Sequence, residues 1–299
     1  MPKVSVILPT YNRAKLISRS IGSVLSQDFS DLELLIIDDG SADDTEKIVR
    51  GFPDRRIRYV RNAKNKGAAF SRNLGIKLAE GDYIAFQDSD DEWLPHKLKK
   101  QVRIFEEVSP KADIVYTNML RVSPDKTEVV RPETIKPEDG IIYKDALDNK
   151  VRSIGIQTAL FKRRCFELAG GFDETFPRWI DFEFFINVSR YSLFYHLDEE
   201  TVKWNETAGS ISLSRDSLII ARKLLVDKYY DDFLRYGKRC ALADHLYGIG
   251  HALCQKGEMK EGRKYIFRAI RVCPNFVKAL AAVPVMFFGP RFYNALHKF

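Results

Sequence analysis

Short apolar runs recur along the first 116 residues, separated by stretches in which apolar residues return every three or four positions. The second spacing is that of one helix face, whereas a short apolar run bounded by polar turns is typical of a buried strand. Strands and helices in alternation indicate βαβ units. The chain is therefore predicted to be an α/β protein with a doubly wound, mainly parallel sheet and helices on both faces. The predicted strands are Val4–Leu8, Leu32–Ile37, Ile57–Val60, Tyr83–Phe86 and Ile114–Tyr116.

A polar cluster follows each of the first four predicted strands. Ligands of open α/β sheets bind outside the carboxyl ends of the strands, so these clusters are expected to converge on one crevice. The sequence has no GxGxxG fingerprint after the first strand and no Walker motif, so a metal and side chains are expected to hold any phosphate. The clusters are Pro9–Arg13, Asp38–Ser41, Asn65–Gly67 and Asp88–Asp91.

Asp88 and Asp90 stand two positions apart, directly after the strand-like run Tyr83–Phe86. Residues i and i+2 of an extended chain project to the same side, so the two carboxylates can share one hard divalent cation. Such a Mg²⁺ or Mn²⁺ site, bridging to a diphosphate, predicts a nucleotide-diphosphate enzyme. An alternative stays open, because Ser89 and Glu92 also match a helix capping box.

Composition fits one large α/β domain with an appendage. Of the 299 residues, 45% are hydrophobic and 30% are charged, as in ordinary soluble proteins. The cysteines lack paired CxxC spacing, so neither a disulfide framework nor a zinc site is expected, and a reducing compartment fits. The first strand begins directly after Met1-Pro2-Lys3, so no cleavable signal is expected. The cysteines are Cys165, Cys240, Cys254 and Cys273.

The C-terminal third is basic and has helical spacing. Residues 201–299 carry 17 Lys and Arg against 8 Asp and Glu, although the whole chain has a net charge of only +7. The apolar stretch Phe276–Pro290 contains Pro284 and is too short to span a bilayer. It is expected either to lie in a membrane interface or to pack on the helical appendage. No dense Lys/Arg run interleaved with aromatics is present, so no nucleic-acid partner is expected.

These motifs, in this order, resemble the family 2 glycosyltransferases, which have the GT-A fold. Two later segments are similar to the acceptor-side signature of that family, namely Gly170–Glu174 and Trp179–Glu183. The resemblance covers about residues 3 to 200. It implies a GT-A catalytic domain over 1–212, with a donor half of about 1–117 and an acceptor half of about 118–212, followed by a basic helical region, 213–299, that offers a membrane or partner surface. The matching donor-side stretches are Val4–Arg13, Ile36–Ser41, Asn65–Gly67, Ser71–Asn73 and Asp88–Pro95.

The resemblance implies a donor site at the strand ends. Tyr11 would lie against the base and Asp39 would accept a hydrogen bond from it, which suits the aromatic face and N–H of uracil. Asp38 has a second interpretation, as a buried carboxylate that ties down its turn. Asp90, with Asp88, would hold the divalent cation. The implied donor-binding residues are Pro9, Thr10, Tyr11, Arg13, Asp38, Asp39, Lys66, Gly67, Arg72, Asp88 and Ser89.

On the acceptor side, the resemblance makes Asp181 the candidate catalytic base. The family commonly has Glu-Asp here, but this chain has Ile180 before the aspartate, and Glu183 is the nearest competitor. Gln157, Trp179 and Glu183 are candidate acceptor contacts. The segment between Val122 and Val151 is expected to form a hairpin or mobile excursion, and Ile154–Phe161 is expected to return as a strand. The family's Arg-x-His before Ser-x-Ser lacks its histidine in residues 204–212.

Together the resemblance implies an inverting, metal-dependent hexosyltransferase. It would move a sugar from a nucleotide diphosphate donor, a UDP-sugar, to a hydroxyl of a glycan or lipid-linked acceptor, in the cytoplasm or peripherally on the cytoplasmic membrane face. Two alternatives are open. A non-catalytic nucleotide-sugar-binding scaffold would bind donor without turnover, and a sugar nucleotidyltransferase would need a glycine-rich loop after the first strand.

Overall fold

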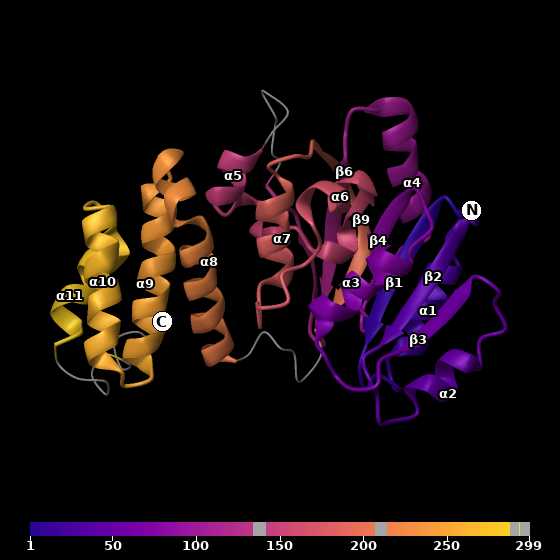
Figure 1. The fold of residues 1–299 in the computed structure, drawn as a ribbon, viewed down its shortest axis with the longest axis horizontal. Coiled ribbons are helices and arrows are strands. Elements are labelled where there is room, and N and C mark those ends of the chain that lie inside the picture. Colours follow the sequence, from indigo (N-terminus) through magenta and orange to yellow (C-terminus); the bar gives the residue numbers. More distant parts are fainter. Residues whose placement is uncertain (134–141, 207–213, 288–292, 294–299) are drawn as a thin grey trace. The chain divides into compact units, whose positions relative to one another are not determined.

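The computed structural model describes residues 1–133, 142–206, 214–287 and 293, and its described parts form two compact units (Figure 1). The first unit comprises residues 1–146, 150–174 and 180–208, and the second comprises 147–149, 175–179 and 209–299. The predicted domain boundary at 212/213 lies in 207–213, outside the described residues.

All five predicted strands are confirmed, and they belong to one sheet of the first unit. Its order is β3-β2-β1-β4-β8-β6-β9-β5, with β7 paired to β6. The four strands from β3 to β4 are parallel, as the βαβ pattern predicts. Beyond them β8 runs antiparallel to β4 and β6, so the sheet is mixed. The strands are β1 Val4–Thr10, β2 Leu32–Asp38, β3 Ile57–Arg61, β4 Tyr83–Phe86, β5 Glu92–Trp93, β6 Ile114–Val122, β7 Thr127–Val130, β8 Leu160–Lys162 and β9 Phe194–Asn205.

Helices cover both faces of the sheet, as predicted. Val4, Val6 and Leu8 of β1 belong to the core cluster that includes buried residues of α1, α2 and α4. The alternate residue Ile7 faces α3, where a Cβ on Gly75 would lie 2.4 Å from the Ile7 side chain, so this helix packs closely on the strand. The helices of the first unit are α1 Ile17–Leu25, α2 Thr45–Arg50, α3 Ala68–Leu78, α4 Lys97–Arg103, η1 Ile104–Val108, α5 Tyr143–Leu147, η2 Lys150–Ser153, η3 Ile156–Thr158, α6 Arg164–Ala169 and α7 Ile180–Val188.

An aromatic cluster fixes α6 and α7 against the sheet. Phe184 of α7 stacks on Phe166 of α6 with ring centroids 5.3 Å apart, and Phe86 at the end of β4 meets Phe172 at 5.2 Å. Phe184 is fully buried. Because α7 begins at Ile180, this packing fixes the position of Asp181 in its first turn.

The segment after β6 agrees with the prediction only in part. β6 and β7 form the expected hairpin, while residues 134–141 lie outside the described part of the chain. The predicted strand Ile154–Phe161 is largely wrong, because η3 occupies Ile156–Thr158 and β8 begins only at Leu160. The reason is that Gln157, inside η3, is buried and bonded to a distant carboxylate.

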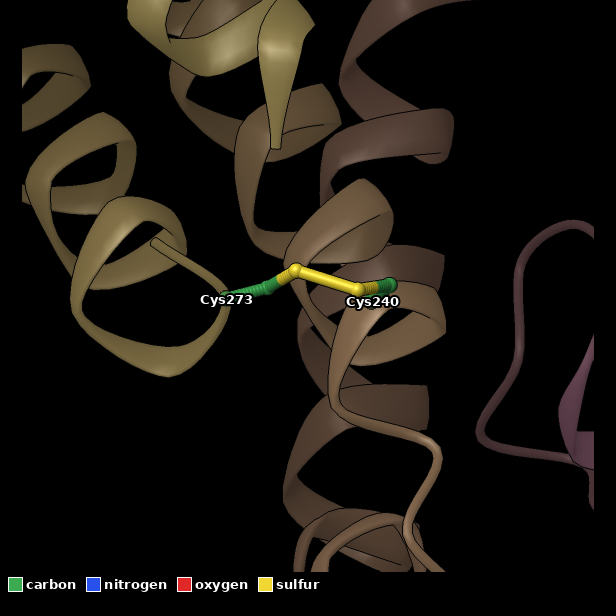
Figure 2. The surroundings of a disulfide bond; sticks show 2 residues. All are labelled: Cys240 and Cys273. Atoms are coloured by element: carbon green, nitrogen blue, oxygen red, sulfur yellow. A yellow bond between two sulfur atoms is a disulfide. The ribbon is translucent and has the colours of Figure 1, made fainter. Parts of the chain in front are cut away.

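The second unit is helical, as expected for the C-terminal third. Its helices are α8 Arg215–Arg235, α9 Arg239–Gln255, α10 Met259–Val272 and α11 Val277–Val285. Cysteine spacing, from which no disulfide framework was expected, does not reveal one disulfide that the structure contains: Cys240 and Cys273 are joined, with Cα atoms 5.3 Å apart (Figure 2). The pair escapes a spacing rule because it is made by the packing of α10 against α9. This disulfide also removes the argument from cysteine spacing for a reducing compartment.

In the parts of the chain that the structure describes, no helix combines the length and the apolarity needed to cross a bilayer. The apolar C-terminal stretch begins as α11, with Pro284 in its last turn. Residues 288–292 and 294–299 lie outside the described residues, so much of the 276–299 prediction falls there.

Candidate active site

The polar loops after the parallel strands meet at one edge of the sheet. The backbone N–H of Asn12, after β1, donates to Ser41 Oγ, after β2, at 2.9 Å. The Arg13 guanidinium lies 3.7 Å from the Asp90 carboxylate, after β4. The structure thus brings together loops that the strand pattern predicts to converge.

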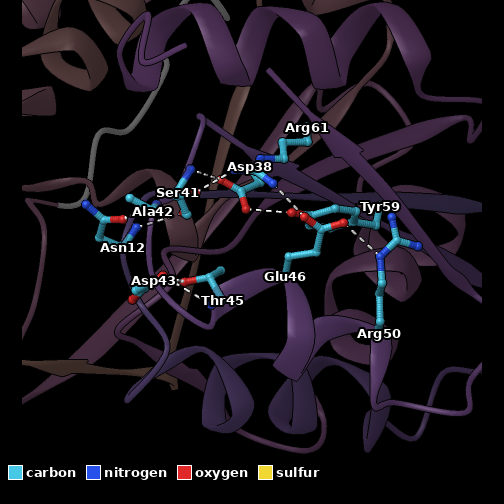
Figure 3. Close-up of polar contacts among 10 residues, drawn as sticks. All are labelled: Asn12, Asp38, Ser41, Ala42, Asp43, Thr45, Glu46, Arg50, Tyr59 and Arg61. Atoms are coloured by element: carbon cyan, nitrogen blue, oxygen red, sulfur yellow. Dashed lines mark hydrogen bonds and ion pairs between the residues drawn. The ribbon is translucent and has the colours of Figure 1, made fainter. Parts of the chain in front are cut away.

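Asp38 is fully buried at the end of β2. Its carboxylate accepts hydrogen bonds from the Ser41 backbone N–H at 2.7 Å and from the Tyr59 hydroxyl at 2.6 Å (Figure 3). These contacts favour the interpretation in which Asp38 ties down the turn. Its predicted donor-binding role remains a prediction.

Asn12 and Thr45, to which sequence reasoning assigned no role, hold the first two loops together. Asn12 has a positive φ of 53° and accepts a hydrogen bond from the Ala42 N–H at 2.8 Å (Figure 3). The Arg13 N–H donates to Thr45 Oγ1 at 3.0 Å. Asparagine tolerates a left-handed backbone better than most residues, so Asn12 itself is the local signal for this turn. A pocket at this junction is lined by Asn12, Arg13, Ala14, Lys15, Leu16, Asp43 and Asp44.

Asp39 organises the loop that leads into α3. It is 4% exposed and accepts from Asn62 Nδ2 at 2.8 Å, from the Lys66 N–H at 3.0 Å and from the Gly67 N–H at 2.7 Å. Gly67 has a φ of 94°, a conformation that favours glycine. The carboxylate predicted to bind the base therefore also holds the loop that leads into α3.

The remaining cradle residues leave groups available to a ligand. Tyr11 is 45% exposed, so its ring is free to stack. The Thr10 hydroxyl is buried and has no hydrogen-bond partner among the described residues. Pro9 is half-buried beside it, and the exposed Lys66 places Nζ 4.1 Å from the Phe70 ring centroid.

Arg72 joins the two halves of the predicted site. From α3 its guanidinium donates to Asp88 Oδ1 at 2.8 Å and to Asp181 Oδ1 at 2.9 Å. Its side chain is 8% exposed, and Nε is buried without an acceptor in the described structure. A donor-side carboxylate and the candidate base thus share one buried cation.

The environment of Asp181 favours its protonated form. Burial raises the pKa of this carboxyl above its ordinary value, the Arg72 charge opposes that rise, and the Asp88 charge adds to it. About a third of the side chain, 32%, is still exposed. A carboxylate with a raised pKa is a stronger proton acceptor.

Asp91, to which sequence reasoning assigned no role, is the buried anchor of the acidic loop. It is 1% exposed and accepts from the Asn205 N–H and from Gln157 Nε2, each at 3.0 Å. Burial raises its pKa to about 8, and the neighbouring Asp88 and Asp90 charges add to the rise. Asn205 Nδ2 also donates to the Asp90 carbonyl at 3.1 Å, so β9 holds this loop from behind.

The capping-box interpretation of this loop is wrong. Glu92 begins β5, and α4 starts only at Lys97, after Pro95. Ser89 is 7% exposed within the turn. The alternative fails because Glu92 and Trp93 pair with β9 instead of entering a helix.

Two of the three candidate acceptor residues are buried in the first unit, and the third belongs to the second unit. Gln157 is buried against Asp91, and Glu183 is 1% exposed within α7. Trp179 belongs to the second unit, where its ring lies 4.9 Å from the Arg222 guanidinium and 5.9 Å from the His245 ring. The acceptor roles of all three remain predictions.

The acidic loop suits a divalent cation whose remaining ligands come from water and substrate. Among the described residues, no group of three or more His, Cys, Asp or Glu could hold a metal by itself. Mg²⁺ typically takes one or two carboxylates and fills its other positions with water and substrate phosphates. Asp88 and Asp90, whose side chains are 29% and 21% exposed, supply that number of carboxylates.

Comparison with known proteins identifies the class of this fold. A family model described as Glycosyl transferase family 2 matches residues 5–168. An Escherichia coli protein named UDP-Glc:alpha-D-GlcNAc-diphosphoundecaprenol beta-1,3-glucosyltransferase WfgD is 48% identical over 99 residues, which are 33% of this chain and 39% of that protein. The "Putative teichuronic acid biosynthesis glycosyltransferase TuaG" of Bacillus subtilis is 37% identical over 164 residues, which are 54% of this chain and 63% of that protein. The chain therefore spans less than two thirds of each relative.

Solved structures share the fold at low sequence identity. S. aureus TarS in complex with UDP-GlcNAc has a TM-score of 0.70 and 21% identity, over 98% of this chain and 88% of that chain. The mannosyltransferase PcManGT of Pyrobaculum calidifontis, in complex with GDP-Man and Mn²⁺, has a TM-score of 0.59 and 19% identity, over 99% of this chain and 81% of that chain. Together with the sheet order, these likenesses assign the GT-A fold.

Proposed function

The chain belongs to glycosyl transferase family 2, and from this premise we propose that it is an inverting, metal-dependent hexosyltransferase. It moves a sugar from a UDP-sugar to a hydroxyl of a glycan or lipid-linked acceptor. The name of the E. coli relative specifies UDP-Glc and a diphosphoundecaprenol-linked acceptor, which supports both substrate classes. TarS with UDP-GlcNAc supports the choice of uridine.

The observation that carries this proposal is the shared contact of Arg72. An inverting displacement needs the donor diphosphate and the attacking hydroxyl on opposite sides of one carbon, with a proton acceptor on the hydroxyl side. Arg72 sits between Asp88, after a donor-side strand, and Asp181, on the acceptor-side helix α7. One buried guanidinium thus holds a carboxylate for each side of the reaction.

Each side chain then has a distinct task. The exposed Tyr11 ring stacks on the base. Arg72 occupies Oδ1 of Asp181, so we assign the proton of the acceptor hydroxyl to Oδ2. The raised pKa of Asp181 makes it a better acceptor for that proton.

Asp88 and Asp90 would hold Mn²⁺ or Mg²⁺ together with the donor diphosphate. A cation held by these two carboxylates would neutralise negative charge on the leaving diphosphate. PcManGT in complex with Mn²⁺ supports this assignment. Arg13, 3.7 Å from Asp90, adds a second positive group at the same edge.

We assign the place of action to the cytoplasmic face of a membrane. An acceptor linked to diphosphoundecaprenol, as in the name of the E. coli relative, is anchored in lipid, so an enzyme for such an acceptor works at the membrane surface. The basic C-terminal region supports peripheral contact.

A thermal-shift screen of nucleotide-sugars, with and without Mn²⁺, tests the donor and metal assignments. A ligand that binds only the native state stabilises it by about 2.7 kcal/mol at 100 times its Kd. We expect a UDP-sugar to raise the Tm most when Mn²⁺ is present. Asp90→Ala should lose the Mn²⁺-dependent part, while Asp125→Ala, which removes an exposed carboxylate from the β6–β7 turn, should keep it.

The outcomes separate the two assignments. Unchanged Mn²⁺-dependent stabilisation of Asp90→Ala contradicts the metal site. Failure of every nucleotide-sugar to stabilise the unaltered chain contradicts the proposed function itself. Stabilisation without release of UDP in the presence of acceptor would favour a binding scaffold.

A further inference from the structure

Helix α10 has one buried face and one basic face. A Cβ on Gly262 would lie 2.7 Å from the Gly250 carbonyl oxygen of α9, so the two helices are in close backbone contact on the inner side. The exposed side chains recur at spacings of three and four and therefore share the outer side. The inner residues are Met259, Gly262, Ile266 and Ala269. The outer residues, called here the basic stripe, are Lys260, Lys264, Phe267, Arg268 and Arg271.

The basic stripe has little acidic compensation. Glu261 is the one acidic residue in the sequence of α10, and Lys264 Nζ donates to it at 2.6 Å. In the middle of the stripe Phe267 is 45% exposed. A large apolar ring thus stands among cations on a helix surface.

Several apolar side chains of helix α11 and of the residues just after it are exposed to solvent. Val277 is 74% exposed, Leu280 is 44% exposed and Phe287 is 58% exposed. Val277 and Leu280 stand three positions apart on one side of α11, while Ala279 and Ala282 are fully buried on the other. Phe287 follows the helix, which ends at Val285. We call these three exposed residues the apolar stripe.

The two stripes adjoin. The Arg263 guanidinium of α10 lies 5.3 Å from the Phe287 ring, and Arg263 stands one helical turn before Phe267. The disulfide between Cys240 and Cys273 ties the end of α10 to the start of α9, so the basic stripe stands on a cross-linked support. One continuous surface therefore combines cations with exposed aromatic and aliphatic groups.

We propose that the basic stripe of α10 and the apolar stripe of α11 form one docking surface for an anionic lipid bilayer. Lys and Arg near an anionic leaflet each gain attraction from its surface potential, and apolar side chains on the same surface enter the headgroup and acyl boundary. The exposed aliphatic side chains of Val277 and Leu280 favour a lipid partner over a nucleic acid, because such side chains have no attractive interaction with phosphates. The proposed transferase function explains why a bilayer would be near, but the docking surface is tested without sugar transfer.

Co-sedimentation of the full chain with vesicles tests the basic stripe. Binding to phosphatidylcholine vesicles that contain phosphatidylglycerol should exceed binding to pure phosphatidylcholine. The test variant should lose at least about tenfold in vesicle affinity, because each cation near the surface contributes separately. Its four changes are Lys260→Gln, Lys264→Gln, Arg268→Gln and Arg271→Gln.

A matched variant removes the same charge from exposed positions of the first unit. Its vesicle affinity should stay within about twofold of that of the unaltered chain, because these changes lower the net charge but leave the docking surface intact. Its changes are Lys47→Gln, Lys99→Gln, Arg103→Gln and Lys111→Gln. Equal losses in the two variants would overturn the assignment to α10, because net charge alone would then explain binding.

The apolar stripe has a separate test. Leu280→Gln with Phe287→Gln should weaken the binding that survives high salt, since salt screens the basic stripe but not apolar insertion. Unchanged salt-resistant binding would overturn the role of α11. Circular dichroism checks that the variants fold. If they do not, the salt dependence of vesicle binding by the unaltered chain still tests the electrostatic contribution expected of the basic stripe.

Two further outcomes would overturn the proposal as a whole. One is binding to neutral and anionic vesicles to the same weak extent. The other is concentration-dependent self-association that the same changes abolish, without vesicle binding. Donor-induced Tm shifts, measured on the same variants, should remain unchanged, so a failed docking surface is distinguishable from a failed transferase assignment.

Discussion

The charged groups at the strand ends of the first unit and those on α10 of the second unit lie in opposite environments. At the strand ends of the first unit, Asp38, Asp39, Arg72 and Asp91 are each less than a tenth exposed. On α10 of the second unit, by contrast, the cations of the basic stripe face solvent. Burying a charge is costly unless partners compensate, whereas an exposed charge carries almost no such cost.

This contrast indicates where each unit does its work. In the first unit the buried charges have specific partners, such as the two carboxylates on Arg72, so a ligand must replace or join existing contacts. In the second unit the exposed charges have few partners, so a broad anionic surface can be recognised without rearrangement. Chemistry is therefore expected at the buried charges and docking at the exposed ones.

Among the substitutions that test this contrast, Asp181→Asn should have the largest effect. Asparagine keeps the size of the side chain and an acceptor for Arg72, but it cannot take the proton of the acceptor hydroxyl. We expect transfer to fall by about two to four orders of magnitude, the scale of a lost general base, while UDP and metal binding stay near normal. Measured with saturating acceptor, transfer within a few-fold of the unaltered chain would remove Asp181 from this role. Glu183 would then be the next candidate.

A second prediction uses the buried proton of Asp91. Its pKa is raised from 3.8 to about 8, so between these values the folded state keeps a proton that the unfolded state has lost. The contribution of this group to stability therefore decreases as pH rises, by at most about 1.4 kcal/mol per pH unit. Asp91→Asn cannot titrate, so between pH 5 and 7.5 it should lose about 3 kcal/mol less stability than the unaltered chain.

Urea denaturation in EDTA at several pH values measures that difference. EDTA is needed because a bound cation would change the charge beside Asp91. Asp125→Asn, an exposed control, should follow the unaltered chain. Parallel pH profiles for Asp91→Asn and the unaltered chain would show that the buried carboxyl does not hold its proton.

A third prediction concerns the second unit, whose stability should depend on its cross-link. Cys240 and Cys273 are 33 residues apart, and closing a loop of that length lowers the conformational entropy of the unfolded chain by an amount worth about 4 kcal/mol. Cys240→Ser with Cys273→Ser should lose about that much in denaturant unfolding under oxidising conditions. Reductant should destabilise the unaltered chain similarly and leave the variant unchanged. Equal stability in oxidising buffer would contradict the cross-link.

Much of the first unit is readable from its sequence because its signals are local. The apolar run Tyr83–Phe86 coincides with β4, and the clusters after the strands meet as the topology requires. A parallel sheet forces its strand ends to one edge whatever the loops contain. Strand periodicity therefore suffices for the parallel part of the sheet, from β3 to β4, and for the meeting of the loops that follow its strands.

The features that escaped prediction depend on partners far away in the chain. Asp91 is an anchor only because Gln157 and Asn205, which are 66 and 114 residues away, donate to it. The same distant contact turns the strand-like stretch around Gln157 into a 3₁₀ turn. Cys240 and Cys273 have no local spacing signal. In each case tertiary contacts override local pattern.

The smallest expected effect concerns Asp38. It tests whether this buried carboxylate only stabilises its turn or also takes part in donor binding. Tyr59→Phe removes the hydroxyl that donates to Asp38 at 2.6 Å and leaves the buried carboxylate with the Ser41 N–H. Loss of a hydrogen bond to a charged group should cost about 2 kcal/mol in unfolding free energy. If Asp38 only stabilises its turn, the affinity of Tyr59→Phe for the UDP-sugar should stay within about twofold of the unaltered chain. A tenfold loss of affinity, about 1.4 kcal/mol, would instead indicate that Asp38 takes a direct part in donor binding. Tyr191→Phe is the matched control, because it removes a tyrosine hydroxyl from a side chain that is 46% exposed and has no predicted donor-binding role, so it should leave both stability and affinity nearly unchanged.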